Sequence, residues 1–218
     1  MNRPIRSYVL RQGRTTPAQK RALEELFPKY GIAFSREKIS STRSLVLEIG
    51  SGMGETTVAI AKAHPEVDFI AIEVHGPGVG SLLNMIEREQ LANVRVIRHD
   101  APEVLTHMIP DGALAAIHLF FPDPWPKKRH HKRRLVQPGF AALAASKLRA
   151  GGILHAATDW PEYAEHMKEV FSQEALLEPA VAGFTARPVT KFESRGRRLG
   201  HPVRDLVFRR KGKAPAAR

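Results

Sequence analysis

The sequence predicts an α/β protein with a mostly parallel, doubly wound sheet and helices on both faces. Short β-rich runs alternate with stretches of helical apolar spacing, and a glycine-rich turn joins the first strand to the helix after it. The chain has 218 residues, of which 43% are hydrophobic and none is cysteine, so it can bury a full core and is neither disordered nor a disulfide scaffold.

The first half of the chain sets the pattern. Residues 44–49 (SLVLEI) form a β-rich run that ends in the turn 50–54 (GSGMG), and residues 55–64 then show helical spacing up to Pro65. The same alternation predicts strands at 68–73, 94–98 and 113–121 and helices at 78–91 and 102–109.

The second half continues this alternation to the last strand. The spacing predicts a helix at 138–148 capped by two glycines, a strand at 153–157, a helix at 161–173 and a strand at 203–210. We find no internal repeat, and the length suits one domain over residues 1–218. Its expected parts are a basic N-terminal segment at 1–40, the sheet and helices at 44–210 and a tail at 211–218.

Positive charge is concentrated in three segments. The chain carries 34 Lys and Arg against 22 Asp and Glu, for a formal net charge of +12. Residues 1–21, 127–134 and 195–218 together carry a net +20, which leaves a net −8 on the rest. Such a pattern favours a polyanion as partner, with nucleic acid ahead of a membrane surface, although solvated basic tails are the alternative.

The sequence contains no expected membrane or export segment. No apolar run approaches the roughly 20 residues that a membrane helix needs, and residues 1–10 lack the apolar stretch of a signal peptide. We therefore expect a cytoplasmic protein that does not bind a membrane.

Acidic residues follow four of the predicted strands. They are Glu48, Glu73, Asp100 and Asp123. In a doubly wound sheet, ligands bind outside the carboxyl ends of the strands, so these carboxylates are expected to share one site. Each alone is explained equally well as a loop carboxylate or a helix cap, but four at successive strand ends favour a cationic or hydroxyl-rich ligand.

The glycine turn favours a cofactor without phosphates. Gly50, Gly52 and Gly54 have GxGxG spacing, whereas the dinucleotide fingerprint needs GxGxxG, and Glu48 and Glu55 on either side repel a pyrophosphate. S-adenosylmethionine, with its sulfonium and amino group, suits an acidic site. Glu73 is then placed for the ribose hydroxyls. Asp100 is placed for the adenine amine.

A proline-punctuated loop and a basic run follow the fourth strand. In FPDPWP, residues 121–126, the prolines are expected to push Phe121, Asp123 and Trp125 into extended conformations and to stiffen the loop. The run KKRHHKRR follows at once, which suggests a base held near the cofactor by a loop that leads into phosphate contacts. Trp125 is either a base-stacking platform or a hydrophobic plug. The paired histidines lack a spaced third metal ligand, so phosphate contact is preferred to metal binding.

The motifs GSGMGE, AIEVHGPGVG, FFPDPWPKKRHHKRR, ATDW and RPVTKFESRGRRLGH together resemble the bacterial tRNA (guanine-N7)-methyltransferases. The resemblance covers residues 2–210. It implies the Rossmann-like fold of class I S-adenosylmethionine-dependent methyltransferases, with seven strands of which the last is antiparallel. It also implies methylation of the guanine at tRNA position 46 in the variable loop.

The resemblance also implies roles for individual residues. Asp123 would be catalytic and would bind the cofactor with Glu48, Glu73, Asp100 and the three glycines. The residues implied for substrate are Lys127, Asp159, Thr190, Lys191, Phe192 and Glu193. The residues implied for RNA are Arg129, His130, His131, Lys132, Arg133 and Arg134.

The expected chemistry needs no metal and no strong base. Guanine N7 has an in-plane lone pair and no proton to lose, so positioning and electrostatics should supply most of the rate. Asp123 and Asp159 could accept from the guanine donor edge, but Asp159 is equally well placed as a helix cap. The competing functions are methylation of another RNA or base and RNA binding without catalysis. The sequence indicates no required protein partner.

Overall fold

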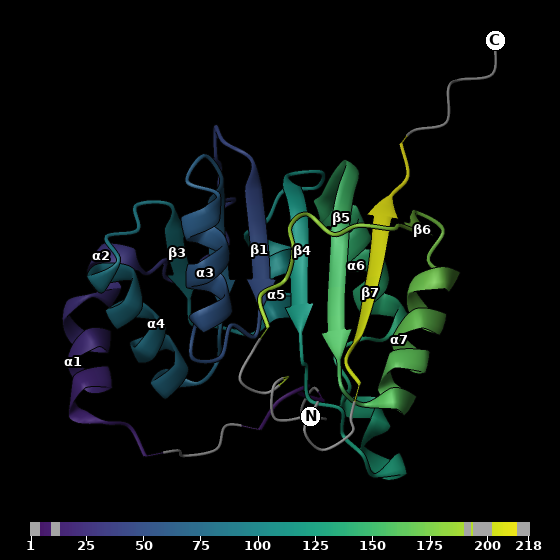
Figure 1. Ribbon diagram of the computed structural model, residues 1–218, viewed down its shortest axis with the longest axis horizontal. Helices are drawn as coiled ribbons and strands as arrows, with labels where there is room; N and C mark the ends of the chain where they lie inside the picture. The colour runs from purple at the N-terminus through teal and green to yellow at the C-terminus, as the bar shows by residue number, and fades with distance from the viewer. Residues whose placement is uncertain (1–4, 10–13, 190–192, 194–201, 213–218) are drawn as a thin grey trace.

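The computed structural model describes residues 5–9, 14–189, 193 and 202–212. Its centre is a seven-stranded sheet in the order β3-β2-β1-β4-β5-β7-β6 (Figure 1). All neighbouring strands are parallel except those next to β7, which runs antiparallel to β5 and to β6. The strands are β1 Leu45–Ile49, β2 Asp68–Ile72, β3 Val94–Ile97, β4 Leu114–Phe120, β5 Leu148–Thr158, β6 Leu177–Pro179 and β7 Arg204–Arg210. The predicted fold class is confirmed.

Helices cover both faces of the sheet. One group of helices packs together over β1 to β3, with its apolar side chains in one core cluster. A second group packs on the opposite face around a second cluster. The first group is α1 Pro17–Glu25, α2 Phe27–Tyr30, α3 Glu55–Ala63 and α4 Gly76–Arg88, and the second is α5 Ala101–His107, α6 Pro138–Lys147 and α7 Pro161–Gln173. None of the described helices is long and apolar enough to cross a membrane.

The main differences from the predicted elements lie at the N-terminus and around β5. The expected basic segment 1–40 contains α1, whose capping box pairs Thr16 with Gln19 and whose first residue is Pro17. That signal was present in the sequence. Strand β5 begins at Leu148 and not at 153, because the ladder with β4 continues through an irregularity beside Gly151, which has a φ of 76°. The short strand β6 was also missed.

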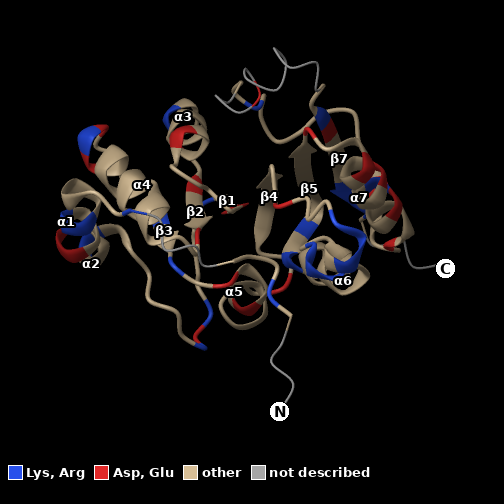
Figure 2. Ribbon diagram, turned by 90° about the horizontal axis from the view of Figure 1, so that it is seen from below, with Lys and Arg blue, Asp and Glu red and all other residues tan. Residues whose placement is uncertain are grey.

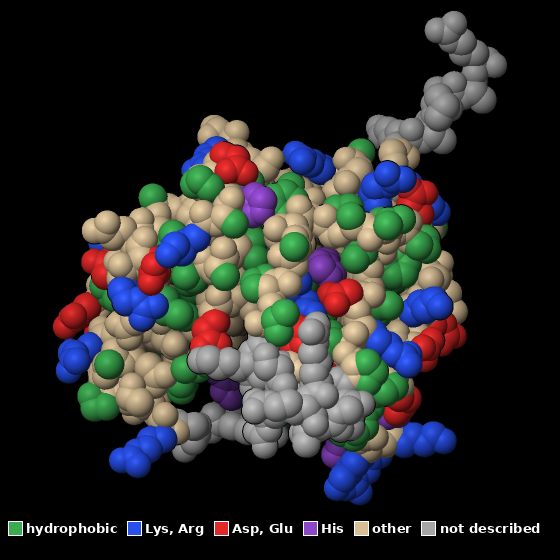
Figure 3. Space-filling view, in the orientation of Figure 1, with side chains coloured by type: hydrophobic (Ala, Val, Ile, Leu, Met, Phe, Trp, Pro, Cys, Tyr) green, Lys and Arg blue, Asp and Glu red, His purple; other side chains and the backbone are tan. Residues whose placement is uncertain are grey.

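The face that carries α1, α3 and α4 has no described helix over β4 and β5. Residues 180–189, which we call the strap, cover this part (Figure 1). After β6 the strap crosses in front of β5 and β4 and then turns toward the carboxyl ends of the parallel strands. In the space-filling view of the same face, hydrophobic side chains lie across the middle and most Lys and Arg lie around the rim (Figure 3).

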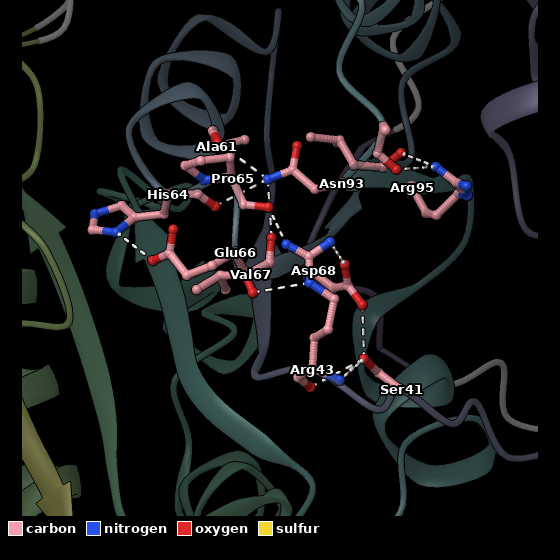
Figure 4. A network of polar contacts seen from close by, with 12 residues as sticks. Ser41, Arg43, Ala61, His64, Pro65, Glu66, Val67, Asp68, Asn93 and Arg95 are labelled. Atoms are coloured by element: carbon pink, nitrogen blue, oxygen red, sulfur yellow. Dashed lines mark hydrogen bonds and ion pairs between the residues drawn. The ribbon is translucent and has the colours of Figure 1, made fainter.

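A polar network closes the opposite edge of the sheet, at the amino ends of the strands (Figure 4). Arg43 forms an ion pair of 3.1 Å with Asp68 at the start of β2. The side-chain amide of buried Asn93 donates to three carbonyl oxygens at and after the end of α3, those of Ala61, His64 and Val67. Because these groups satisfy one another, this edge is structural.

Candidate active site

A cavity of about 420 Å³ lies at the carboxyl ends of β1, β2 and β4. Its wall includes Gly50, Gly52, Glu73, Asp100 and Asp123, so the structure brings together five of the predicted cofactor-binding residues. No Lys or Arg of the described chain lines it. An acidic cavity of this size fits a small cationic molecule and is a poor site for a pyrophosphate.

The glycine turn between β1 and α3 needs its glycines for two different reasons. Gly50 and Gly52 have φ values of 76° and 56° and line the cavity. Gly54 has a φ of 92° and caps α3, where an added Cβ would lie 2.7 Å from the Cβ of Leu82. The first two glycines therefore let the backbone approach a ligand, whereas Gly54 allows α3 and α4 to pack closely.

Glu73 is fixed by backbone amides. One carboxylate oxygen accepts from the N–H of Gly52 at 2.8 Å, and the other accepts from Val74 at 2.7 Å and His75 at 2.8 Å. The side chain is buried in the cavity wall. Its orientation is therefore set before any ligand binds, as the predicted role in holding ribose hydroxyls requires.

Glu48 lies behind the cavity wall and not on it, which corrects the prediction that it lines the pocket. Its carboxylate accepts from the Thr57 hydroxyl at 2.6 Å, on the side of the sheet where α3 packs. Burial raises the pKa of Glu48 to about 7, against the effect of the Thr57 bond, and the negative charge of Glu73 adds to the increase. Glu48 is therefore partly protonated near neutral pH.

The other two acids on the wall differ in exposure. Asp100 is partly buried at the start of α5, and burial, followed by the nearby charge of Glu103, raises its pKa. Asp123 is exposed on its loop. The predicted adenine and catalytic carboxylates therefore line the same cavity.

The prolines predicted an extended conformation for the loop that carries Asp123, but the loop is extended only in part. Phe121 and Trp125 have φ values of 54° and 46°. The N–H of Phe121 donates to the carbonyl of Ala157 at 2.7 Å, so the chain stays tied to β5 as it turns away from the sheet. Bonding to a neighbouring strand has overridden the local preference of a residue before proline.

Trp125 is neither a core plug nor an open stacking platform. It is half-buried, its indole N–H donates to the carbonyl of Ser7 at 2.9 Å, and the guanidinium of Arg133 lies 4.2 Å from its ring. Ser7 and Tyr8 themselves line the cavity. The sequence did not predict this contact, because residues 7 and 125 are far apart in the chain and meet only in the folded protein.

The basic run forms a 3-10 helix, η1 Lys128–Arg133, that is exposed along much of its length. Viewed from below, Lys and Arg gather beside α6, near the acidic ends of the strands (Figure 2). The exposed cations at its surface are Lys127, Lys128, Arg129 and Lys132. His130 and His131 are partly buried, and no group of three metal-ligating side chains occurs among the described residues.

The last two arginines of this run are used internally. Arg133 donates to the carbonyls of Arg6 and Tyr8, both at 3.3 Å. The side chain of Arg134 is 2% exposed, donates to the carbonyl of Pro124 at 2.8 Å and pairs with Glu162 at 3.3 Å. Arg134 therefore holds the loop onto α7 and is not available to RNA, which corrects its predicted role.

The predicted substrate residues lie on two further segments. Asp159 follows β5 and does not cap α7, because the N-cap is Trp160 and no side-chain hydrogen bond caps the helix. This removes the competing interpretation of Asp159. Glu193 is buried against Arg187, with an oxygen–nitrogen distance of 2.6 Å. Thr190, Lys191 and Phe192 lie outside the described residues.

The strand order, the antiparallel β7 and the acidic cavity after β1 and β2 define the class I methyltransferase fold. Two solved structures share it at low sequence identity. The precorrin-6y C5,15-methyltransferase of Geobacter metallireducens has a TM-score of 0.55 at 12% identity and covers 89% of this chain and 86% of its own. The 16S rRNA (adenine(1408)-N(1))-methyltransferase of Catenulisporales acidiphilia has a TM-score of 0.53 at 16% identity. The match covers 82% of this chain and 90% of that one.

The sequence comparisons identify the family. Residues 42–206 match the protein-family model described as "Putative methyltransferase". The tRNA (guanine-N(7)-)-methyltransferase of Nitrosomonas eutropha is 55% identical over 94% of this chain and 96% of its own length. The enzyme of the same name from Neisseria meningitidis serogroup A is 53% identical over 96% and 92%. The chain belongs to this methyltransferase family.

Proposed function

We propose that the protein transfers the methyl group of S-adenosylmethionine to N7 of guanine in tRNA, forming 7-methylguanosine at position 46 of the variable loop. The observation that carries the proposal is one loop, residues 121–134, which places Asp123 on the acidic cavity and continues directly into the exposed cations of η1. The shared name of relatives at 53% to 55% identity supports the same substrate.

The cavity residues fit S-adenosylmethionine. Glu73 would accept from the ribose hydroxyls, Asp100 from the adenine amine, and the acidic surroundings would favour the cationic sulfonium and amino group. Gly50 and Gly52 would let the backbone approach the ligand. The bound cofactor supplies an electrophilic methyl group, and the apolar wall of β1, β2 and β4 side chains excludes water around it.

The residues of the chain act on guanine by positioning and charge. The Asp123 carboxylate would accept hydrogen bonds from the donor edge of the base and would stabilise the positive charge that develops when N7 forms its bond. Asp159, which no helix cap engages, is proposed as a second acceptor, and Lys127 as a donor to O6. Because guanine N7 carries no proton, the reaction needs no general base. Asp123 is therefore required only as a hydrogen-bond acceptor and a negative charge.

The exposed cations are proposed to bind the tRNA backbone. Lys128, Arg129 and Lys132 are exposed and follow the Asp123 loop in the chain. We further propose that the enzyme works in the cytoplasm and needs neither a metal ion nor a protein partner. Activity of the purified chain in the presence of EDTA is the expected outcome.

The test uses the purified full-length chain, labelled S-adenosylmethionine and an unmodified tRNA transcript, followed by nucleoside analysis. We expect 7-methylguanosine with the wild-type transcript and none with a transcript that carries adenosine at position 46. Methylation of a different nucleoside, or equal transfer to both transcripts, would contradict the proposed substrate.

A further inference from the structure

The strap reaches the active site as a fixed segment. At its start the N–H of Ala180 donates to the carbonyl of Val207 on β7 at 2.9 Å. Farther along, the Thr185 hydroxyl lies 3.0 Å from a ring nitrogen of His64 at the end of α3. The strap is therefore tied to both sides of the face it crosses before it reaches Arg187.

Gly183 and Phe184 fill the space between the strap and the sheet. An added Cβ on Gly183 would lie 2.6 Å from a ring nitrogen of His155, so only glycine fits there. Phe184 packs against the rings of His64 and His118, at centroid distances of 5.5 and 6.3 Å. This close packing sets the height of the strap above β4 and β5.

The side chain of Arg187 is the centre of an ion network in which Arg187 and Glu193 are buried and Asp205 is 41% exposed. Arg187 is 5% exposed, and it binds both carboxylate oxygens of Asp205, at 3.0 and 3.2 Å. Its remaining terminal nitrogen donates to Glu193 at 2.6 Å. His155 contacts the same Asp205 from β5 at 2.8 Å. A guanidinium has the planar fork of donors that such a double contact needs, and an ammonium does not.

The network stays ionised. Burial opposes the charge of Asp205, but hydrogen bonds from His155 and Arg187 outweigh it and hold the pKa of Asp205 well below its usual range. Burial likewise opposes the charge of Arg187, and its bonds to Asp205 and Glu193 raise its pKa nonetheless. The buried charge of Arg187 is therefore stable only while Asp205 and Glu193 remain in place.

The same guanidinium reaches the loop of Asp123. It lies 5.3 Å from the ring centroid of Phe121 and 5.8 Å from that of Phe120. Phe121 lines the cavity and stands two residues before Asp123. One side chain thus contacts the proposed catalytic loop on one side and the end of the proposed substrate stretch on the other.

We propose that Arg187 is a positioning residue that fixes Glu193 relative to Asp123. The guanidinium holds the buried carboxylate of Glu193 in one orientation. The expected effect on kcat rests on the proposed function. The expected effect on the order of Glu193 rests only on the contacts described above.

The first test replaces Arg187→Lys, which keeps the charge and loses the fork. At saturating tRNA and cofactor, kcat should fall by roughly 10- to 100-fold, as expected when reacting groups are misplaced. Calorimetric affinity for S-adenosylhomocysteine should stay within about twofold, because Arg187 does not line the cavity. The matched control is Arg209→Lys on β7, whose guanidinium pairs with Glu178 at an exposed position and whose loss should leave kcat unchanged.

Together, kcat and the melting temperature distinguish a positioning role of Arg187 from a purely stabilising one. If Arg187 only stabilises the fold, the variant will melt at a lower temperature but will retain wild-type kcat below its transition, and the proposal is overturned. Glu193→Gln offers an independent route, since it removes the charge and keeps an acceptor for the guanidinium. The double variant should be no more than about twofold slower than the slower single variant, because both changes break one contact. Multiplicative losses would show that Glu193 works independently of Arg187.

A measurement without turnover keeps the inference distinguishable from the proposed function. In hydrogen exchange of the ligand-free protein, the peptide that contains Glu193 should exchange faster in Arg187→Lys, while the peptide spanning β1 and the glycine turn should not change. An unchanged Glu193 peptide would overturn the positioning role. If the wild-type chain fails to methylate tRNA, the proposed function fails, but this exchange difference still decides the inference.

Discussion

The two halves of the active-site edge are built by different means. On the cofactor side, after β1 and β2, backbone amides within one strand–helix–strand unit hold Glu73, and the bond to Gly52 spans 21 residues. On the substrate side, after β4 and β5, the contacts join distant segments, and the bond from Trp125 to Ser7 spans 118 residues. The cofactor side is therefore specified locally, whereas the substrate side depends on the whole fold.

This difference predicts which property each half controls. A side chain on the cofactor side is held by backbone amides of adjacent turns, so its loss should weaken cofactor binding and affect only those turns. A side chain on the substrate side is part of a chain of ion pairs, so its loss should also move other groups. The following variants test that contrast.

Asp123→Asn should give the largest effect. The amide keeps the shape but removes the charge that stabilises the developing positive base, and we expect kcat to fall by about 10²- to 10³-fold with the fold intact. Single-turnover methylation with saturating tRNA measures it. Asp111→Asn is the control, because Asp111 is exposed and lies before the amino end of β4, whereas the cavity lies at the carboxyl end, and it should keep wild-type kcat. Near-normal transfer by Asp123→Asn would show that proximity alone suffices and that the residue is not catalytic.

Glu73→Ala should mainly affect cofactor binding. Losing a charge-assisted contact should weaken the affinity for S-adenosylmethionine by about 1.5–3 kcal/mol, while tRNA affinity stays the same. Calorimetry for the cofactor and filter binding for tRNA separate the two. Glu24→Ala on the exposed surface of α1 is the control. If tRNA affinity falls as much as cofactor affinity, the cofactor side is not independent of the substrate side.

Glu48→Gln should remove a pH dependence of stability. Because the pKa of Glu48 is raised in the folded state from 4.5 to about 7, the folded state binds more protons, and the free energy of unfolding should fall as pH rises through this window. The fall should be roughly 1–3 kcal/mol for this group. In the variant it should be absent, since glutamine stays neutral. Denaturant unfolding of the ligand-free protein between pH 5 and pH 8 measures it, and parallel curves for variant and wild type would contradict the assignment.

The smallest effect is expected within the basic run. There, exposed cations should affect the salt dependence of tRNA binding, and buried cations should affect the melting temperature. Changing Lys128, Arg129 and Lys132 to Gln should reduce the slope of log tRNA affinity against log salt by about 2 to 3, because each phosphate contact contributes about 0.7 to 0.9. The melting temperature should not change. Arg134→Gln should do the opposite, with a lower melting temperature and an unchanged slope. Equal slopes in both variants would mean that η1 does not contact the phosphate backbone.

The sequence by itself determined the sheet and most of the cofactor side. Strands β1 to β4 and helices α3 to α7 follow from hydrophobic periodicity and turn residues, which are local properties of the chain. The positions of Gly50, Gly52, Glu73 and Asp100 on one cavity follow from the rule that parallel strands present their carboxyl ends at one edge. Backbone geometry alone brings these residues together.

Only the tertiary structure decided which charges are free and which are used. Lys132 and Arg134 are both cations of the run KKRHHKRR. Lys132 is nevertheless exposed, whereas Arg134 is buried against Tyr163 and Glu162. Likewise nothing local in RPVTKFE says that Arg187 binds Asp205 and Glu193. Burial and ion pairing depend on partners supplied by other segments, and those partners are set by packing, which a pattern of neighbouring residues does not contain.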